Sequence, residues 1–170
     1  MSINSVHRER ICSPVSTTAV MRYLSKSMAL DPLQFAYQVR DQNFDIFGNW
    51  VLNTAQAFQE LQGKWHTWVE RLDGFERVYS SLKEGCPVII SVRSPLPGSA
   101  REYKEGHIIA IIGYDADSKE VLCMDPAFLG REESYTRYSL EKLLEAWARR
   151  GYIAYLFQGD KVSLVDQSDI

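Results

Sequence analysis

The fold of this chain is decided by residues 106–126, which read Gly-His-Ile-Ile-Ala-Ile-Ile-Gly-Tyr-Asp-Ala-Asp-Ser-Lys-Glu-Val-Leu-Cys-Met-Asp-Pro. Two apolar runs flank the polar segment Asp-Ala-Asp-Ser, a pattern that predicts a β-hairpin. His107 opens the first predicted strand and Asp125 closes the second. Because antiparallel pairing returns the end of the second strand to the beginning of the first, we expect this imidazole and this carboxylate to lie side by side.

A histidine paired in this way is prepared to act as a general base, because the carboxylate that accepts from one ring nitrogen fixes the tautomer of the other. The candidate nucleophile for such a base is Cys12, far upstream in the chain. A helix is predicted directly after it, with Ser13 as the N-cap and Pro14 as the first helical residue. The thiol then lies at the positive end of the helix dipole, which favours a thiolate. A cysteine that only packs at a helix start is the alternative.

The composition is that of an ordinary globular protein. The chain has 170 residues, of which 45% are apolar and 24% charged, with a net charge of −3. We expect one domain over residues 1–158 and a polar tail over residues 159–170. The negative charge argues against a nucleic-acid partner, and no apolar run is long enough for membrane insertion. No segment resembles a secretory signal, so the cytoplasm is the default compartment, although the sequence assigns neither compartment nor oligomeric state.

Three cysteines occur without a CxxC pair, and this odd number excludes a complete disulfide framework. Cys86 and Cys123 are interpreted as small buried apolar residues. The three histidines have no motif spacing, so neither a metal site nor a cofactor is predicted.

The order of the predicted elements favours an α+β fold, in which N-terminal helices pack against an antiparallel β-sheet. The helix capped by Asn49 is expected to bury Val51, Leu52, Ala55 and Phe58. Trp50 and Asn53 lie one turn apart on it and, with Asn49, are candidates for the wall of a cleft. The segment 94–106 is predicted to be a mobile loop at the rim of that cleft. The elements expected are helices 14–24, 32–39, 50–58, 75–84 and 140–150, and strands 64–72, 87–92, 107–114, 119–125, 136–138 and 152–157.

Several motifs over residues 10–157 together resemble the bacterial C39-like peptidases, which belong to the papain-like cysteine peptidase superfamily. They are Cys-Ser-Pro-x-Ser (12–16), Gly-Asn-Trp-x-x-Asn (48–53), Pro-Val-Ile-x-Ser-Val-Arg (87–93), Leu-Pro-Gly (96–98), Gly-His (106–107), Asp-Pro (125–126) and a tyrosine and tryptophan at 138 and 147. The resemblance implies a papain-like fold and a peptide or protein substrate.

The resemblance also implies roles for individual residues. Cys12 matches the nucleophile, His107 the general base and Asp125 the residue that orients the histidine. The backbone N–H of Cys12 would be one oxyanion donor. Many family members carry a glutamine about six residues before the cysteine as the second donor, but Val6 occupies this position here. His7 and Asn4 are the nearby side chains that can donate, and His7 is the candidate.

Three functions remain open at this point. The first is a thiol hydrolase that cleaves a peptide or isopeptide bond through a Cys12–His107–Asp125 triad and a thioester. The second is a deamidase or acyltransferase that forms the same thioester but passes the acyl group to another acceptor. The third is a degenerate domain that binds peptides without cleaving them, which the valine at position 6 motivates.

Overall fold

The structure is a computed structural model and describes residues 10–159. An α+β fold is observed, as the sequence predicts. Its helices are α2 (Cys12–Leu24), α3 (Pro32–Gln38), α4 (Trp50–Glu60), α5 (Glu76–Lys83) and α6 (Leu140–Ala148). Its strands are β1 (Trp65–Arg71), β2 (Val88–Val92), β3 (His107–Asp115), β4 (Glu120–Met124), β5 (Tyr135–Ser139) and β6 (Ile153–Gly159).

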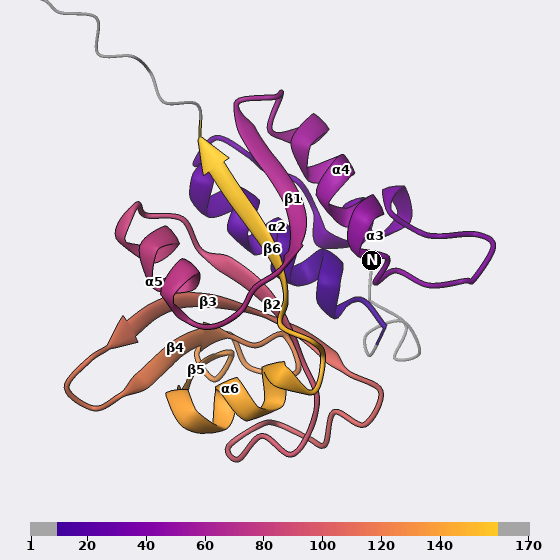
Figure 1. The fold of residues 1–170 in the computed structure, drawn as a ribbon. Helices are drawn as coiled ribbons and strands as arrows, with labels where there is room; N and C mark the ends of the chain where they lie inside the picture. Colours follow the sequence, from indigo (N-terminus) through magenta and orange to yellow (C-terminus); the bar gives the residue numbers. More distant parts are fainter. Residues whose placement is uncertain (1–9, 160–170) are drawn as a thin grey trace, which may run out of the picture.

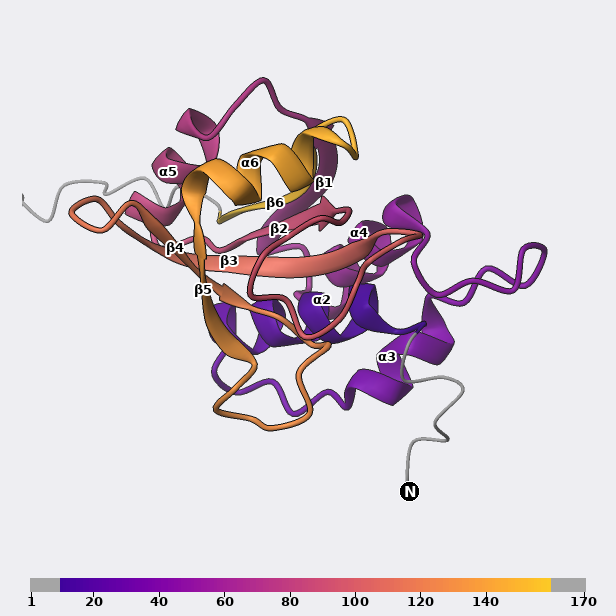
Figure 2. The same cartoon turned by 90° about the horizontal axis from the view of Figure 1, so that it is seen from below.

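The six strands form one antiparallel sheet in the order β1-β6-β2-β3-β4-β5 (Figure 1). Helices α2, α3 and α4 lie on one face of the sheet, and α5 and α6 lie on the other (Figure 2). Side chains of the central strands alternate between the two apolar clusters under these helices: Ile108 and Ala110 pack toward α2, whereas Ile109 and Ile111 pack toward α6. Strand β2 is buried throughout because it is covered on both faces.

The predicted hairpin is present as β3 and β4, which pair from Asp115 opposite Glu120 to Ala110 opposite Met124. The register shifts between Ile111 and Gly113, which adds one residue to β3. Asp125 follows directly after β4, so the pairing returns it toward the beginning of β3.

Helix α2 begins two residues earlier than the sequence predicts, at Cys12 and not at Pro14. Ile11, not Ser13, occupies the N-cap position, and no side chain caps the helix. The predicted cap is wrong because Ser13 is buried and its hydroxyl is hydrogen-bonded to the Tyr155 hydroxyl at 2.9 Å. One turn later, the hydroxyl of Ser16 donates to the carbonyl oxygen of Ile108 at 3.1 Å. These two contacts join the start of α2 to β6 and β3.

Helix α4 begins after Asn49, whose side chain accepts from the first backbone N–H groups as predicted. The expected apolar face is wrong, because Val51 is 66% exposed and Phe58 is 40% exposed. The helix buries a stripe of small residues instead, which consists of Asn53, Thr54 and Ala57. Small side chains allow α4 to approach β1 closely, and Thr67 of β1 donates to the Thr54 carbonyl oxygen at 2.6 Å.

The segment 94–106 is tied to the rest of the fold, contrary to the predicted mobile loop. The backbone N–H of Tyr103 donates to the Ser94 hydroxyl at 2.6 Å, and Arg93 Nε donates to the Lys104 carbonyl oxygen at 2.8 Å. Leu96 and Tyr103 are both buried. These contacts hold the segment against the beginning of β3.

The last described strand, β6, continues to Gly159, which pairs with Trp65. It therefore ends two residues later than predicted, and the predicted tail beyond it lies outside the described residues. Over residues 10–159, no helix combines the length and apolar character that a membrane crossing requires.

Candidate active site

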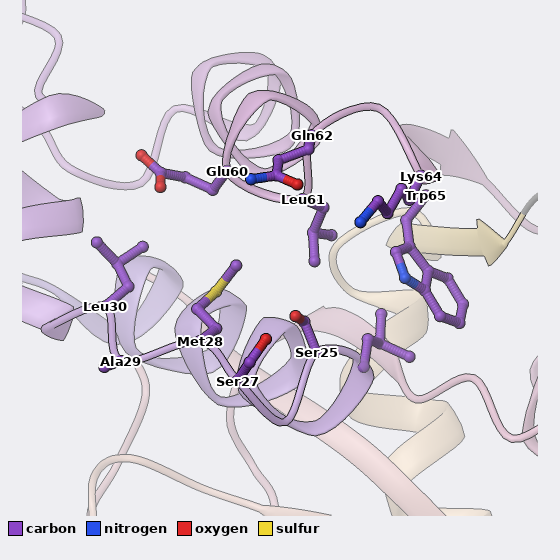
Figure 3. A pocket seen from close by; sticks show the side chains of 11 residues that line it. Ser25, Ser27, Met28, Ala29, Leu30, Glu60, Leu61, Gln62, Lys64 and Trp65 are labelled. Carbon is purple, nitrogen blue, oxygen red and sulfur yellow. The ribbon is translucent and has the colours of Figure 1, made fainter.

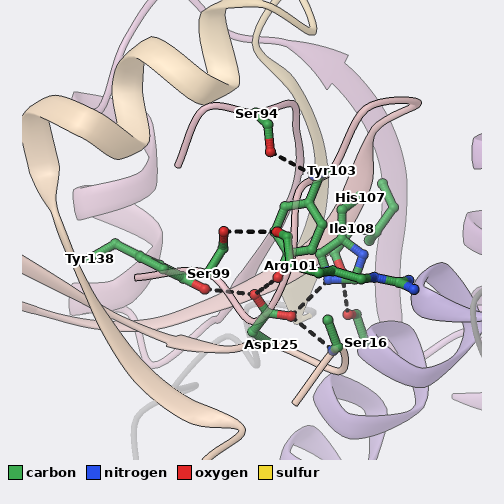
Figure 4. Close-up of polar contacts among 10 residues, drawn as sticks. Ser16, Ser94, Ser99, Arg101, Tyr103, His107, Ile108, Asp125 and Tyr138 are labelled. Carbon is green, nitrogen blue, oxygen red and sulfur yellow. Dashed lines mark hydrogen bonds and ion pairs between the residues drawn. The ribbon is translucent and has the colours of Figure 1, made fainter. Parts of the chain in front are cut away.

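His107 and Asp125 lie in direct contact at the open end of the hairpin. Nε2 of His107 is 2.7 Å from Oδ1 of Asp125 (Figure 4). Both side chains are buried, with exposed fractions of 4% and 0%. The antiparallel register that the sequence predicts therefore brings this pair together.

Asp125 accepts further hydrogen bonds from three neighbours. Its Oδ2 accepts from the hydroxyls of Tyr103 and Tyr138, each at 2.7 Å (Figure 4). Its Oδ1 accepts from the backbone N–H of Ala127 at 2.9 Å. Burial opposes ionisation, but the bond and charge of His107 and the two hydroxyls outweigh it and lower the pKa of Asp125. The carboxylate is therefore held in its charged form.

Tyr103 also contacts the imidazole itself. Its ring stacks on the ring of His107 with 4.1 Å between centroids and 26° between planes. The imidazole is thus fixed by a hydrogen bond at its edge and by a ring on its face.

Sequence reasoning missed both tyrosines as members of the site. Tyr138 belongs to a motif of the family resemblance, but no role follows from that motif, and it is the one buried residue of β5. Tyr103 lies in a segment with no periodic pattern. Only the path of the chain after β2 brings Tyr103 onto the histidine.

Cys12 approaches the histidine from the beginning of α2. Its half-buried thiol is hydrogen-bonded to the side chain of His107, and the backbone N–H groups of Ser13 and Ile108 also donate to it. Since Nε2 of the imidazole faces Asp125, Nδ1 is the nitrogen left for the sulfur. The three residues therefore form one chain of contacts that links a helix to a hairpin.

The charges of Cys12 and His107 stabilise each other. Burial favours the neutral thiol, but the hydrogen bond and charge of His107 outweigh it and lower the pKa of Cys12 below 9.0. Burial also favours the neutral imidazole, but Asp125 and then Cys12 outweigh it and raise the pKa of His107 from 6.5 to about 9. Both shifts favour the charged form of their group, so the contact favours a thiolate beside an imidazolium.

The three predicted cleft residues have different surroundings. Asn49 accepts from the first turn of α4 and donates to Asp41 Oδ2 at 2.9 Å, so its amide is occupied within the fold. Asn53 is fully buried, and its amide donates to the carbonyl oxygens of Phe47 and Asn49 at 2.8 Å. The prediction that Asn53 faces a cleft is wrong, since small buried residues form the packed face of α4.

Trp50 is the member of this group that keeps a partly exposed ring. It packs against the same apolar cluster as Cys12. Helix α4 therefore lies next to α2, as a role in a common cleft requires.

Of the two predicted oxyanion donors, the backbone N–H of Cys12 lies in the described part of the chain and His7 does not. The first backbone hydrogen bond of α2 runs from the Val15 N–H to the Ile11 carbonyl oxygen. The N–H of Cys12 is therefore one of the first N–H groups of the helix, which have no partner within the helix. His7 and Val6 lie outside the described residues.

Two cavities differ in their relation to this site. One of about 330 Å³ is lined by Tyr103 and Gly106, beside the imidazole, together with Arg10 and residues 101–105. A larger one of about 480 Å³ lies between the turn after α2 and the end of α4, where Met28, Leu61 and Trp65 point into it (Figure 3). Since Leu24 at its edge is about 18 Å along the helix axis from Cys12, this larger cavity is separate from the site.

In residues 10–159, His, Cys, Asp and Glu side chains do not gather in groups of three with the spacing of a metal site.

Two comparisons with known proteins bear on this arrangement. The sequence profile described as the Peptidase_C39 like family matches residues 2–155. A crystal structure assigned to a C39-like peptidase from Bacillus anthracis has a TM-score of 0.66 and 18% sequence identity, and the match covers 88% of this chain and 89% of that chain. A search of the curated proteins finds no match. The structural likeness at this identity shows a shared fold, and the profile match extends over most of the sequence.

Proposed function

Because this chain belongs to the Peptidase_C39 like family, we propose that it is a cysteine peptidase that cleaves a peptide or isopeptide bond of a protein substrate. Cys12 is the nucleophile, His107 the acid and base, and Asp125 the residue that orients the histidine. The observation that carries this proposal is the continuous contact from the Cys12 thiol through His107 to Asp125. An activated nucleophile requires a base within hydrogen-bond reach and a third group that orients the base.

The reaction begins with the Cys12 thiolate attacking the carbonyl carbon of the scissile bond, which gives a tetrahedral oxyanion. The backbone N–H of Cys12 donates to this oxyanion at the start of α2. The His107 imidazolium then protonates the leaving amine, the C–N bond breaks, and a thioester remains on Cys12. Neutral His107 next takes a proton from water, and the resulting hydroxide attacks the thioester to release the acid and regenerate the thiolate.

Asp125 keeps its charge through both steps because four donors surround it: His107, the hydroxyls of Tyr103 and Tyr138, and one backbone N–H. A fixed carboxylate stabilises the imidazolium form of the base while the thiolate is free to attack. Trp50, with its partly exposed ring, is proposed to contact the substrate from the α4 side.

The test is cleavage of a defined library of synthetic peptides, with new termini identified by mass spectrometry. We expect the wild-type protein to generate new termini that Cys12→Ala does not generate. Hydroxylamine added during turnover should convert part of the acyl product to a hydroxamate, because it attacks the thioester. Identical termini from both proteins, or none from either, would contradict the proposal.

A further inference from the structure

Arg150 is attached to one face of the sheet but its side chain reaches the other. It follows α6, yet its Nε donates to the hydroxyl of Ser91 in β2 at 3.1 Å. Its guanidinium carbon lies 5.9 Å from the ring centroid of Trp50. Trp50 belongs to α4, which covers the sheet face opposite α6 (Figure 2). The guanidinium therefore enters the side of the molecule where Cys12 begins α2.

Gly106 makes room for this side chain directly before His107. A Cβ atom built on Gly106 would lie 3.2 Å from both Cζ and Nε of Arg150, and the φ angle of Gly106 is +103°. Both the space and the backbone conformation therefore demand glycine at this position. The guanidinium occupies the volume that a side chain would otherwise fill, one residue from the histidine.

The charge of Arg150 has no counterion in the described part of the chain. No carboxylate of residues 10–159 forms an ion pair with it, and its Nη1 and Nη2 groups donate to none of those residues. Its neighbour Arg149 differs, because that side chain lies 3.8 Å from a Glu145 carboxylate and donates to the Pro95 carbonyl oxygen. Arg150 is half-buried, so a partner carboxylate would offset the cost of its partial desolvation.

We propose that Arg150, with Trp50 as the facing wall and Gly106 as the floor, binds an acidic side chain of the substrate close to the scissile bond. The Nη1 and Nη2 groups, which donate to no residue of 10–159, form a fork that matches a carboxylate. The site lies at Gly106, which is adjacent to His107 in the sequence. Successive Cα atoms of a substrate peptide are about 3.8 Å apart, so we expect the acidic residue to lie within two positions of the scissile bond. The inference rests on the proposed function, since it places Glu or Asp in a peptide attacked by Cys12.

The test uses acetylated peptidyl acyloxymethyl ketones that carry Glu, Gln or Lys at one of the two positions before the ketone. The rate of Cys12 alkylation is read by mass spectrometry on wild type, Arg150→Gln, Arg150→Lys and Arg131→Gln. Arg131 is an exposed arginine between β4 and β5, and its loss changes the net charge equally. These probes carry no C-terminal carboxylate, so a preference for Glu reports the side chain alone.

At one of the two positions, we expect the wild type to react about ten-fold or more faster with the Glu probe than with the Gln probe, and most slowly with the Lys probe. Arg150→Gln should remove this preference and leave the rate with the Gln probe within about two-fold. Arg150→Lys should retain part of the preference, because it keeps the charge and loses the fork. Arg131→Gln should behave as wild type. Equal wild-type rates with Glu and Gln, or a preference that survives in Arg150→Gln, would overturn the inference.

Two further measurements separate this inference from the proposed function and from misfolding. Alkylation by iodoacetamide, a small neutral reagent, reports the reactivity of Cys12 without the subsite. If Cys12 is unreactive, the proposed function fails, and Arg150 is then tested by binding of dye-labelled Glu and Gln hexapeptides to Cys12→Ala with and without Arg150→Gln. We expect tighter binding of the Glu peptide only where Arg150 is present, and equal binding would overturn the inference. Thermal unfolding of each variant verifies the fold.

Discussion

Cys12 and Cys123 lie near the same histidine–carboxylate pair, but the structure gives their thiols opposite properties. Cys123 is fully buried inside β4, and burial together with the charge of Asp125 raises its pKa well above 9.0. Cys12 also loses solvent, but the hydrogen bond and charge of His107 lower its pKa. A positive partner therefore decides reactivity, whereas proximity to the carboxylate alone suppresses it.

The two environments differ in which hydrogen-bond donors they contain. At Cys12, Ser13 at the start of α2 and Ile108 at the start of β3 supply backbone N–H groups that donate to the sulfur. Cys123 lies inside the sheet, opposite Ile111 of β3 and Thr136 of β5, and no hydrogen-bond donor contributes to the pKa of its thiol. A thiol at a helix start thus becomes a nucleophile where a thiol inside a strand stays inert.

The largest difference is expected when each cysteine is replaced in turn. Cys12→Ala should lower the rate of peptide cleavage by at least about 1,000-fold, because the nucleophile is removed. Cys123→Ala should leave the rate within about three-fold but lower the free energy of unfolding by about 1 kcal/mol, because it leaves a small cavity in the core. Cleavage rates and urea unfolding measure both effects. Loss of cleavage in a folded Cys123→Ala protein would contradict the distinction.

The second expected difference is the rate of alkylation at pH 6. A thiol of ordinary pKa is only about 0.3% thiolate at this pH, so Cys12 should react with iodoacetamide about 100-fold faster than Cys86 or Cys123. His107→Ala should slow Cys12 by about ten-fold or more, because the imidazolium that stabilises the thiolate is lost. Peptide mass spectrometry measures all three cysteines in one sample. A Cys12 rate equal to that of a free peptide thiol would contradict the ion pair.

The pH dependence of cleavage should separate the two members of the ion pair. The pKa of His107 is raised to about 9, so the imidazolium that protonates the leaving amine is lost as the pH rises through this value. Cleavage should therefore fall several-fold between pH 8 and pH 10, whereas alkylation of Cys12 should not fall, because the thiolate persists. Parallel pH profiles of kcat/KM and of the alkylation rate measure this. Cleavage that keeps rising to pH 10 would show that no imidazolium is required.

The smallest expected effect concerns the hydroxyls on Asp125. Tyr103→Phe and Tyr138→Phe each remove one hydrogen bond to an ionised, buried carboxylate and should lower the free energy of unfolding at pH 7 by about 1–3 kcal/mol. Cleavage should fall about three- to ten-fold, because Asp125 orients His107 less well. Tyr152→Phe is the matched control, since its ring packs on Trp147 while its hydroxyl bonds no residue of 10–159.

The pH dependence of the loss of stability in Tyr103→Phe and Tyr138→Phe tests whether the lost hydrogen bond to Asp125 causes it. The pKa of Asp125 is lowered in the folded protein, so its stabilisation is present above the unfolded value near 3.8 and is lost as the pH falls through the folded value. The difference between each Phe variant and wild type should therefore shrink as the pH is lowered from 7 toward 2. Urea unfolding over this range measures it. A difference that does not change with pH would indicate lost packing alone.

The sequence predicts those parts of the site that depend on short stretches of chain. The alternation of two apolar runs about a polar turn predicts the hairpin, and the hairpin register places His107 next to Asp125. The position of Cys12 at a helix start is also a local property, although the capping residue is Ile11 and not the predicted Ser13. Local patterns are sufficient here because strand pairing across a short turn leaves few alternatives.

The sequence does not predict which face of α4 is buried. Counting apolar residues favours a face with Val51 and Phe58, but the helix packs through Asn53, Thr54 and Ala57. The close approach of α4 to β1 and α2 selects small side chains, and this distance is a property of the assembled layers. For the same reason the amide of Asn53 is used inside the fold and not in a cleft.

The amino-acid sequence by itself therefore determined the α+β fold, the hairpin that pairs His107 with Asp125, and a helix start next to Cys12. Only the tertiary structure decided that Cys12 meets this pair, that Tyr103 and Tyr138 hold the carboxylate, and that Arg150 crosses the sheet to Trp50. The physical reason is the distance along the chain. Hairpins and helix starts are set by neighbouring residues, whereas these contacts join segments whose mutual position depends on how both faces of the sheet are packed.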